Sequence, residues 1–387
     1  MPIDRRATLQ LLEELIATES VNPTLVPGAS GEQRAAKHVR DFLCTRGVLA
    51  ELEDAAPGRP NVVAVTSGAT GITNSKPALM IVAHIDTVGP GDMPNPFTPR
   101  VHDRKMYGRG ALDIKSGVAA MCAAAVAIAE QRVQLARPFI IAAVVDEECD
   151  SIGTQALLHR GYTADSAVVL EPTNLQLVVA HKGYAWFEIV TRGRAAHGSL
   201  PSEGRDAIRM MGRVLDALEE LERRIVARRA HPRLGQASLH ASLITGGQEL
   251  SSYPAECRLK LERRMLPGET EASVEGEFGA MLAQLEKQDS NFRATLAGLG
   301  SRPAYSIAEN TPQVQRVSTV VQKICGDCEL AGMAAWTDTA LLAAAGIPGV
   351  VFGPSGRGLH GADEYVEIES VYTCADALLE LILECCA

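Results

Sequence analysis

The 387-residue sequence has no excess of basic residues and no long apolar run. Its 37 lysines and arginines are outnumbered by 47 aspartates and glutamates, which gives a formal net charge of -10. A chain without a basic field has little with which to hold a phosphate backbone, so we expect no nucleic-acid partner. The most apolar stretch, 118–129, is alanine-rich and shorter than the roughly 20 residues that cross a bilayer, so we expect no membrane partner.

The sequence also lacks the features of a secreted, disulfide-bonded protein. It begins with an amphipathic helical pattern, in which Leu9, Leu12 and Ile16 share one face, and we expect no secretion signal. The nine cysteines are odd in number and scattered, which is typical of reduced cytoplasmic proteins. Cys325 and Cys328 have the spacing of a zinc knuckle or a redox pair, but no second pair lies nearby, so helix-end packing is the favoured interpretation.

What is present is an ordinary globular composition, long enough for two domains. Hydrophobic residues make up 46% and charged residues 22%, close to average usage. Over residues 1–180, apolar segments alternate with helical patterns, which predicts a layered α/β domain with a mostly parallel sheet. The Gly- and Pro-rich segment 88–110 should be loop. Strands are predicted at 61–66, 79–84, 139–145 and 167–170, and helices at 31–46 and 116–130.

The middle segment, 181–297, follows a different pattern. Its order of strand, helix, strand, strand, helix, strand is typical of a small α+β sandwich. The α/β pattern then returns over 298–387, so the simplest interpretation is one catalytic domain interrupted by an inserted module. The module's strands are predicted at 185–192, 237–243, 257–262 and 293–297 and its helices at 207–229 and 271–286; helices at 311–324 and 369–383 and a strand at 349–352 follow.

Histidines and carboxylates occur where these predicted strands end. His84 and Asp86 lie two apart, so both side chains leave the same face, and the aspartate can hold the second ring nitrogen of a metal-bound histidine. Read alone, His84 is better explained as a capped structural residue at a strand end. Asp113, between a glycine-rich loop and a helix, is either a helix N-cap or a carboxylate that bridges two metals.

The remaining candidates follow the same placement. Glu147 and Glu148 complete a run of three carboxylates after a buried strand, which costs free energy unless cations or solvent neutralise them. The run is either an acidic surface turn or a metal ligand beside a general base. Glu171 ends the next strand, and His360 lies in a glycine-rich loop. In layered α/β proteins, this edge of the sheet is where binding sites are built.

Taken together and in order, these segments resemble the family of co-catalytic zinc peptidases that includes aminoacylase, acetylornithine deacetylase and succinyl-diaminopimelate desuccinylase. The resemblance covers nearly the whole chain. It is carried by His-Ile-Asp at 84–86, Gly-Arg-Gly-Ala-Leu-Asp-Ile-Lys-Ser-Gly at 108–117, Asp-Glu-Glu at 146–148, Glu-Pro-Thr at 171–173 and the histidine at 360 before Asp-Glu-Tyr at 363–365.

The resemblance implies a centre of two divalent ions, zinc in the first place, with cobalt or manganese as alternatives. One ion would be held by His84, Glu171 and a bridging Asp113. The other would be held by His360, Glu148 and the same Asp113. The resemblance also implies that the peptide bond after Asp113 is cis.

Further roles follow from the resemblance. Glu147 would be the general base, and Asp86 would support the first histidine. In the module, a lid and dimer interface, His197 lies in a Gly-x-x-x-His-x-x-x-Pro segment and would stabilise the oxyanion in the partner's site of a homodimer. Arg264 is aligned with a lid arginine that pairs with substrate carboxylate. Ser251 stands where the family commonly has asparagine, and a hydroxyl offers one donor instead of two, so that contact is in question.

Within the family, the sequence predicts a deacylase acting on an N-acyl amino acid or short peptide. Segments 170–173 and 336–338 look most like the acetylornithine deacetylase branch. A desuccinylase and a glutamate-type carboxypeptidase or dipeptidase are the alternatives. An inactive binding relative would be expected to lose ligands or base, and all are present. A nucleotide-binding α/β protein would need a glycine-rich phosphate loop, which the strands lack.

Overall fold

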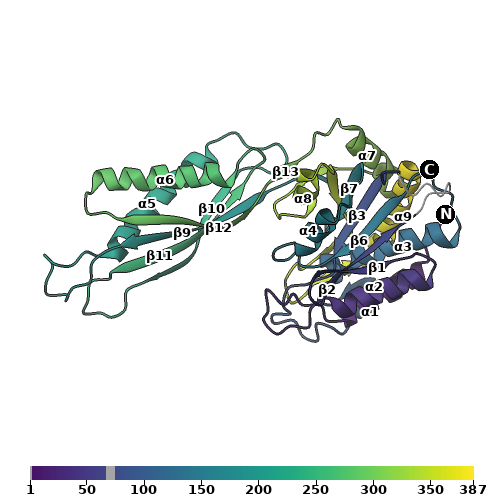
Figure 1. Ribbon diagram of the computed structural model, residues 1–387, viewed down its shortest axis with the longest axis horizontal. Coiled ribbons are helices and arrows are strands. Elements are labelled where there is room, and N and C mark those ends of the chain that lie inside the picture. The colour runs from purple at the N-terminus through teal and green to yellow at the C-terminus, as the bar shows by residue number, and fades with distance from the viewer. Residues whose placement is uncertain (1, 67–74) are drawn as a thin grey trace. The chain divides into compact units, whose positions relative to one another are not determined.

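The computed structural model describes residues 2–66 and 75–387 and divides into two compact units (Figure 1). Unit 2 is inserted into the chain of unit 1. It is larger than the segment 181–297 that the sequence suggested, because it extends to residue 306 and includes a second short segment. Unit 1 comprises Met1–Val179, Ile307–Ala331 and Thr337–Ala387, and unit 2 comprises Ala180–Ser306 and Gly332–Trp336.

A large mixed sheet forms the centre of unit 1, in the order β1-β2-β6-β3-β7-β15-β8. The central strands β6, β3, β7 and β15 are parallel, and antiparallel strands flank them on both sides. The expected mostly parallel sheet is therefore parallel only in its centre. The strands are β1 (Glu51–Ala56), β2 (Arg59–Val65), β3 (Leu79–His84), β6 (Phe139–Val144), β7 (Ser166–Leu170), β8 (Leu177–His181) and β15 (Gly349–Phe352), and β8 also pairs with β13 (Tyr305–Ser306) and β14 (Leu330–Met333).

Helices cover both faces of this sheet, because alternate residues of each central strand point to opposite sides. In β3, Leu79 and Ile81 enter one apolar cluster, and Met80 and Val82 enter another. The first cluster is completed by α1 (Arg5–Ala17), α2 (Gln33–Thr45), α3 (Ser116–Glu130), α7 (Pro312–Cys325) and α9 (Ile368–Cys386), and the second by α4 (Ile152–His159) and α8 (Thr339–Ala344).

The central helix α3 is apolar on every side. Together with the turn before it, the segment Ala111–Glu130 has the length and composition of a membrane span. However, 94% of its most apolar window is buried within the protein. Its many alanines let α1, α9 and the sheet approach closely, so the segment has the properties of a core helix.

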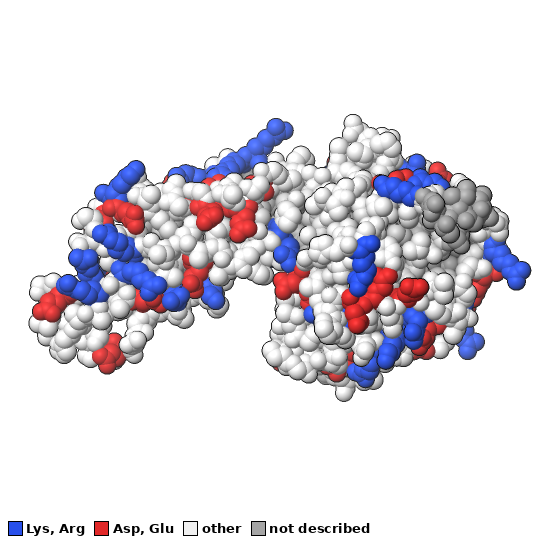
Figure 2. All heavy atoms as spheres, viewed as in Figure 1, with Lys and Arg blue, Asp and Glu red and all other residues white. Residues whose placement is uncertain are grey.

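Unit 2 contains an antiparallel sheet in the order β10-β11-β9-β12, with α5 and α6 packed on one face (Figure 1). The order along the chain, strand, helix, strand, strand, helix, strand, is the predicted one. The buried residues of α5 recur every three or four positions, as expected for an amphipathic helix. Acidic and basic side chains are interspersed over the visible surface (Figure 2). The elements are β9 (Gly183–Arg192), α5 (Ala207–Val226), β10 (Ser238–Gly246), β11 (Glu256–Met265), α6 (Glu271–Gln288) and β12 (Ala294–Arg302).

The segment 88–110 is not entirely loop, so that expectation was wrong. It contains β4 (Arg100–His102) and β5 (Lys105–Tyr107), which form a small sheet with β16 (Gly356–Arg357) and β17 (Tyr365–Glu367). Strands of two or three residues are too short to produce a detectable alternation of apolar and polar residues. This small sheet joins two loops that are far apart in the sequence.

A buried histidine ends β8. The ring of His181 lies 5.8 Å from that of Tyr305 and 6.3 Å from that of Trp336, centroid to centroid. Its Nδ1 is 3.1 Å from the carbonyl oxygen of Lys182, and its Nε2 has no hydrogen-bond partner within the described part of the chain. Burial lowers the pKa of His181 to about 4, so the ring is neutral in the folded protein at pH 7.

We expect His181 to make folding acid-sensitive. The histidine binds a proton near pH 6.5 in the unfolded chain and only near pH 4 in the folded chain. As the pH falls from 6.5 to 4, the free energy of unfolding should therefore decrease by roughly 3 kcal/mol. Above pH 6.5 the contribution is complete. Urea unfolding at several pH values should show a flatter dependence in His181→Phe. The control His102→Gln, at an exposed histidine, should keep the wild-type dependence; the same result for both variants would contradict the assignment.

Candidate metal centre

The five predicted ligands come together in unit 1. His84 ends β3, Glu148 lies in the turn after β6, and Glu171 follows β7 directly. Because β6, β3 and β7 are parallel neighbours, their carboxyl ends meet at one edge of the sheet. Asp113 lies in the turn before α3, and His360 lies in the loop between β16 and β17. The peptide bond after Asp113 is cis, as the resemblance implied.

Asp113 lies between the two histidines and presents one oxygen to each. Its Oδ1 is 3.1 Å from His84 Nε2, and its Oδ2 is 3.3 Å from His360 Nε2. A glutamate accompanies each histidine: Glu171 Oε1 is 3.9 Å from His84 Nε2, and Glu148 Oε2 is 3.3 Å from His360 Nε2. The arrangement offers two neighbouring sets of ligand atoms that share one carboxylate.

The donor atoms of this cluster fit divalent cations. Glu148 Oε1 and Glu171 Oε1 are buried, and neither has a hydrogen-bond partner among the residues described. A buried carboxylate oxygen without a donor costs free energy, which a cation beside it would offset. Imidazole nitrogens with carboxylate oxygens are ligands that zinc, cobalt and manganese accept. The cluster is therefore a candidate metal site.

Four of the five candidate ligands have raised pKa values. Burial raises the pKa of Glu171 well above its usual value, and it also raises that of Glu148, which the charge of Asp113 raises further. Hydrogen bonds to Asp113 and Glu148 raise the pKa of His360 to about 10. Burial opposes ionisation of Asp113, but hydrogen bonds from both histidines lower its pKa below the usual range. A cation must displace protons from this set in order to bind.

Asp86 lies fully buried behind the cluster and contacts three parts of it. Its Oδ1 is 3.5 Å from His84 Nδ1, and the ring nitrogen is also 3.0 Å from the Asp86 carbonyl oxygen. The backbone N–H groups of Glu147 and Glu148 donate to its two carboxylate oxygens, at 3.2 and 3.3 Å. Asn22 donates to Oδ2 at 2.8 Å. One carboxylate therefore orients the histidine and the turn that carries both glutamates.

The residues that hold this turn from behind were missed in the sequence. Asn22 donates to Asp146 Oδ1 at 3.0 Å, and Arg59 pairs with the same oxygen at 2.8 Å. Arg59 also donates from Nε to the buried Glu32 at 3.0 Å. The Asp146 Oδ2 accepts the backbone N–H of Asp150 at 3.1 Å. Neither Asn22 nor Arg59 belongs to a recognisable local pattern, because the partners lie far away in the chain.

Glu147 lies beside the first histidine. Its ligand atom is within 4.8 Å of those of His84 and Glu171, and its side chain is part-buried. Burial raises its pKa well above the usual value, and the charge of Glu171 adds to this effect. A carboxylate at this position can accept a proton from a group held between the ligands and retain it.

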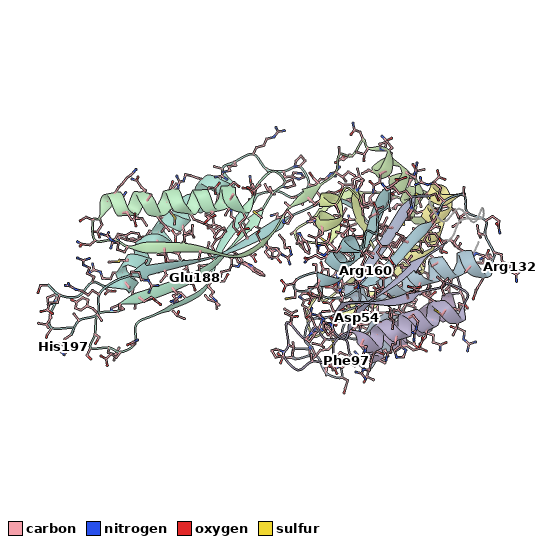
Figure 3. The ribbon with its side chains drawn as sticks, viewed as in Figure 1. Asp54, Phe97, Arg132, Arg160, Glu188 and His197 are labelled. Atoms are coloured by element: carbon pink, nitrogen blue, oxygen red, sulfur yellow. The ribbon has the colours of Figure 1, made fainter. Side chains whose placement is uncertain are left out.

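His197 and Ser251 lie together in unit 2. His197 is exposed in the loops beyond the end of β9 (Figure 3). The backbone N–H of Ser199 donates to its Nδ1 at 3.3 Å, and the Ser199 hydroxyl lies 2.7 Å from the same atom. With Nδ1 as acceptor, the neutral ring carries its proton on Nε2, where it can donate. Gly198 donates to the carbonyl oxygen of Ser251 at 2.7 Å, so Ser251 adjoins this loop.

Arg264 lies on β11 and is already paired. Its Nε donates to Glu262 Oε1 at 2.6 Å, and its guanidinium lies 5.4 Å above the ring of Tyr184. The other oxygen of Glu262 accepts the indole N–H of Trp186 at 2.7 Å. Arg264 therefore belongs to a group of charged and aromatic side chains on this sheet, and a substrate carboxylate would compete with Glu262 for it.

Comparisons with known proteins find a matching family model, relatives and solved structures over most of the chain. Residues 80–384 match the model of peptidase family M20/M25/M40. An N-formyl-4-amino-5-aminomethyl-2-methylpyrimidine deformylase of Halalkalibacterium halodurans is 27% identical, with 99% of this chain and 95% of the relative covered. An acetylornithine deacetylase of Myxococcus xanthus is 28% identical over 87% of this chain and 86% of the relative. A Staphylococcus aureus tripeptidase has the same fold, with a TM-score of 0.80 at 22% identity over 99% of this chain and 98% of that one.

We expect binding of a divalent metal to release protons. The groups whose pKa values are raised hold protons at lower pH, so the apparent affinity for Zn²⁺ or Co²⁺ should increase as the pH rises from about 6 to about 8. Titration calorimetry in two buffers of different ionisation enthalpy measures the protons released, which should be about one or more per ion. Equal heats in both buffers, or affinity independent of pH, would contradict the proton-holding character of the cluster.

Proposed function

The chain belongs to peptidase family M20/M25/M40, and we propose that it removes a short acyl group from the amine of a small molecule. It is a hydrolase that acts on amide bonds, as are its relatives. The observation that carries the proposal is Asp113, which presents one oxygen to each of two histidine and glutamate pairs. The proposed substrate is an N-acyl amino acid, as for an acetylornithine deacetylase. We also propose a cytoplasmic location, because nine free cysteines fit a reducing compartment.

The proposed cofactor is a pair of divalent ions, zinc in the first place, with cobalt or manganese as alternatives. His84, Glu171 and Asp113 would hold one ion, and His360, Glu148 and Asp113 the other. The short distances from Asp113 to both histidines support this division. When bound, such ions polarise the amide carbonyl and lower the pKa of water towards neutrality. The protein residues position the ions and the reacting groups.

Glu147 is the proposed general base. Its carboxylate takes the proton from the attacking water and then gives it to the nitrogen of the departing amine, so one group acts first as base and then as acid. Its burial and the nearby charge of Glu171 raise its pKa above the usual value. Asp86 fixes the turn through the Glu147 N–H and so positions this base.

The deformylase and the acetylornithine deacetylase to which the chain is similar favour a short acyl group, because one removes formyl and the other acetyl. A second candidate substrate is therefore an N-formyl aminomethyl heterocycle. The pairing of Arg264 with Glu262 favours it, since a dedicated carboxylate-binding arginine would be free of such a partner. Ser251, shorter than the expected asparagine, also weakens contact with an amino-acid carboxylate. Desuccinylase and glutamate-type carboxypeptidase or dipeptidase activities remain alternatives.

A substrate screen distinguishes these activities. The metal-restored enzyme would be assayed with N-acetylornithine, the N-formyl aminomethylpyrimidine, an N-succinyl amino acid and a dipeptide. We expect the highest kcat/KM with the N-acetyl or N-formyl compound and no turnover after chelation. Preference for the succinyl compound or the dipeptide would replace the proposed substrate, and failure of every metal to restore cleavage would favour a binding protein.

We also propose a homodimer in which His197 of each subunit serves the other subunit's site. β10 is an edge strand of its sheet, and its Leu243 and Ile244 are 63% and 54% exposed. An exposed apolar edge strand is suited to pair with another chain. The Nε2–H of His197 is a suitable donor to an oxyanion. The inserted unit would thus be both lid and dimer interface.

Replacing Glu147 should abolish turnover without removing metal. In Glu147→Ala, kcat should fall by about a hundredfold or more, the usual contribution of general-base catalysis, while metal content stays at the wild-type level. Asp150→Ala, in the same turn, is the matched control and should remain active. Activity of the Glu147 variant above roughly a hundredth of wild type would refute its assignment as the base.

Mixed dimers test the cross-subunit role of His197. His197→Ala and Glu147→Ala homodimers should each be nearly inactive. When the two chains are co-expressed, each mixed dimer should regain one site that has both residues. Random pairing then gives roughly a quarter of the wild-type activity. No recovery in mixed dimers confirmed by mass spectrometry would exclude action across subunits.

A further inference from the structure

A buried ion pair lies next to the proposed metal ligands but outside the proposed chemistry. Arg109 Nη1 is 2.6 Å from Glu364 Oε2, and the two side chains are 2% and 0% exposed. The residues are 255 positions apart in the sequence. Arg109 lies in the loop before Asp113, and Glu364 follows His360 in its loop. The pair therefore links the two loops that carry a ligand each.

Glu364 binds the backbone of the Asp113 loop with both of its oxygens. Oε1 accepts the N–H of Leu112 at 2.9 Å and that of Asp113 itself at 3.2 Å. Oε2 accepts the N–H of Gly110 at 3.1 Å in addition to the guanidinium of Arg109. Four donors converge on one carboxylate, so a displacement of Glu364 would displace the turn in which Asp113 lies.

Arg109 binds the backbone of the opposite loop. Its Nη2 lies 3.3 Å from the carbonyl oxygen of His360 and 3.2 Å from that of Gly361. A longer contact of 3.4 Å reaches the carbonyl oxygen of Pro90. Each member of the pair thus contacts the backbone of one of the two ligands, and each does so across the gap between the loops.

We infer that Arg109 and Glu364 are positioning residues that set the distance between Asp113 and His360. They would thereby position the ligands of the ion held by His360, Glu148 and Asp113. This inference rests on the proposed two-metal site. Burying two charges is costly, and an apolar pair of similar volume would often stabilise a protein as well. An apolar pair, however, could not bind the backbone N–H of Asp113 and the carbonyl oxygen of His360. Among the described residues, no hydrogen bond or ion pair joins His84 or Glu171 to this pair, so the ion that they would hold should be affected less.

Metal binding by variants of the pair tests this inference. Arg109→Met removes the guanidinium, and Glu364→Gln keeps the shape and one acceptor while it removes the charge. Apo enzyme would be titrated with Co²⁺, with the visible absorption spectrum recorded and both affinities measured by competition with a chromophoric chelator. We expect one of the two ions to bind about tenfold or more weakly in each variant, with an altered Co²⁺ spectrum, and the affinity for the other ion, which shares Asp113, to fall by less.

A second ion pair with a buried arginine provides the matched control. In unit 2, Arg263 has a side chain that is 0% exposed and pairs with Glu269 at 2.5 Å. Arg263→Met should lower thermal stability as Arg109→Met does, but it should leave both Co²⁺ affinities and the spectrum unchanged. A loss of metal binding that merely followed stability would appear in both variants and would overturn the inference.

The outcomes separate this inference from the proposed function. If wild type and both folded variants bind two ions with equal affinity and the same spectrum, the positioning role is wrong and the metal centre stands. If wild type itself binds fewer than two ions, the two-metal site is wrong, and the positioning role falls with it. Glu364→Gln keeps the test decisive if Arg109→Met does not fold, because it changes no volume. In the variants, kcat should fall more than KM rises.

Discussion

Repulsion between carboxylates is the constraint around which unit 1 is organised. Glu147, Glu148 and Glu171 meet beside Asp113 at one edge of the sheet, and burial with mutual charge raises the pKa of the three glutamates. Such a cluster persists only if surrounding groups fix its members. The buried Asp86 fixes two of them by accepting the backbone N–H groups of Glu147 and Glu148, and bound cations would offset the remaining repulsion.

Two separate networks surround this cluster. One lies behind β6 and joins Asn22, Arg59 and Asp146 to the turn with both glutamates. The other is the Arg109–Glu364 pair, which joins the loops of Asp113 and His360. Each network brings together segments that are distant in the chain, and both include charged side chains that bind backbone groups. The sheet brings the strand ends that carry the candidate ligands to one edge, and these networks fix the spacing of the side chains.

The sequence was sufficient for those parts that depend on local pattern. The bounds of β3, α3 and β15 are those predicted, because each is a continuous apolar segment with clear ends. The five candidate ligands could be named because each ends or follows a strand, or follows a glycine-rich loop, in a recognisable order. The antiparallel flanks of the sheet, the two-residue strands, and partners such as Asn22 and Arg59 could not be predicted. Strand direction and pairing over 60 or more residues leave no local pattern.

Because unit 2 is inserted into unit 1, the two parts of unit 1 are synthesised at different times. β15 lies between β7 and β8 in the sheet, yet it is synthesised after the whole of Ala180–Ser306. At about 5–20 residues per second, a ribosome needs roughly 6–25 s to make that stretch. During this interval the nascent unit 1 lacks a central strand, and His360 has not yet been made. Unit 2, whose sheet is contiguous in the chain, can therefore fold before unit 1 is complete.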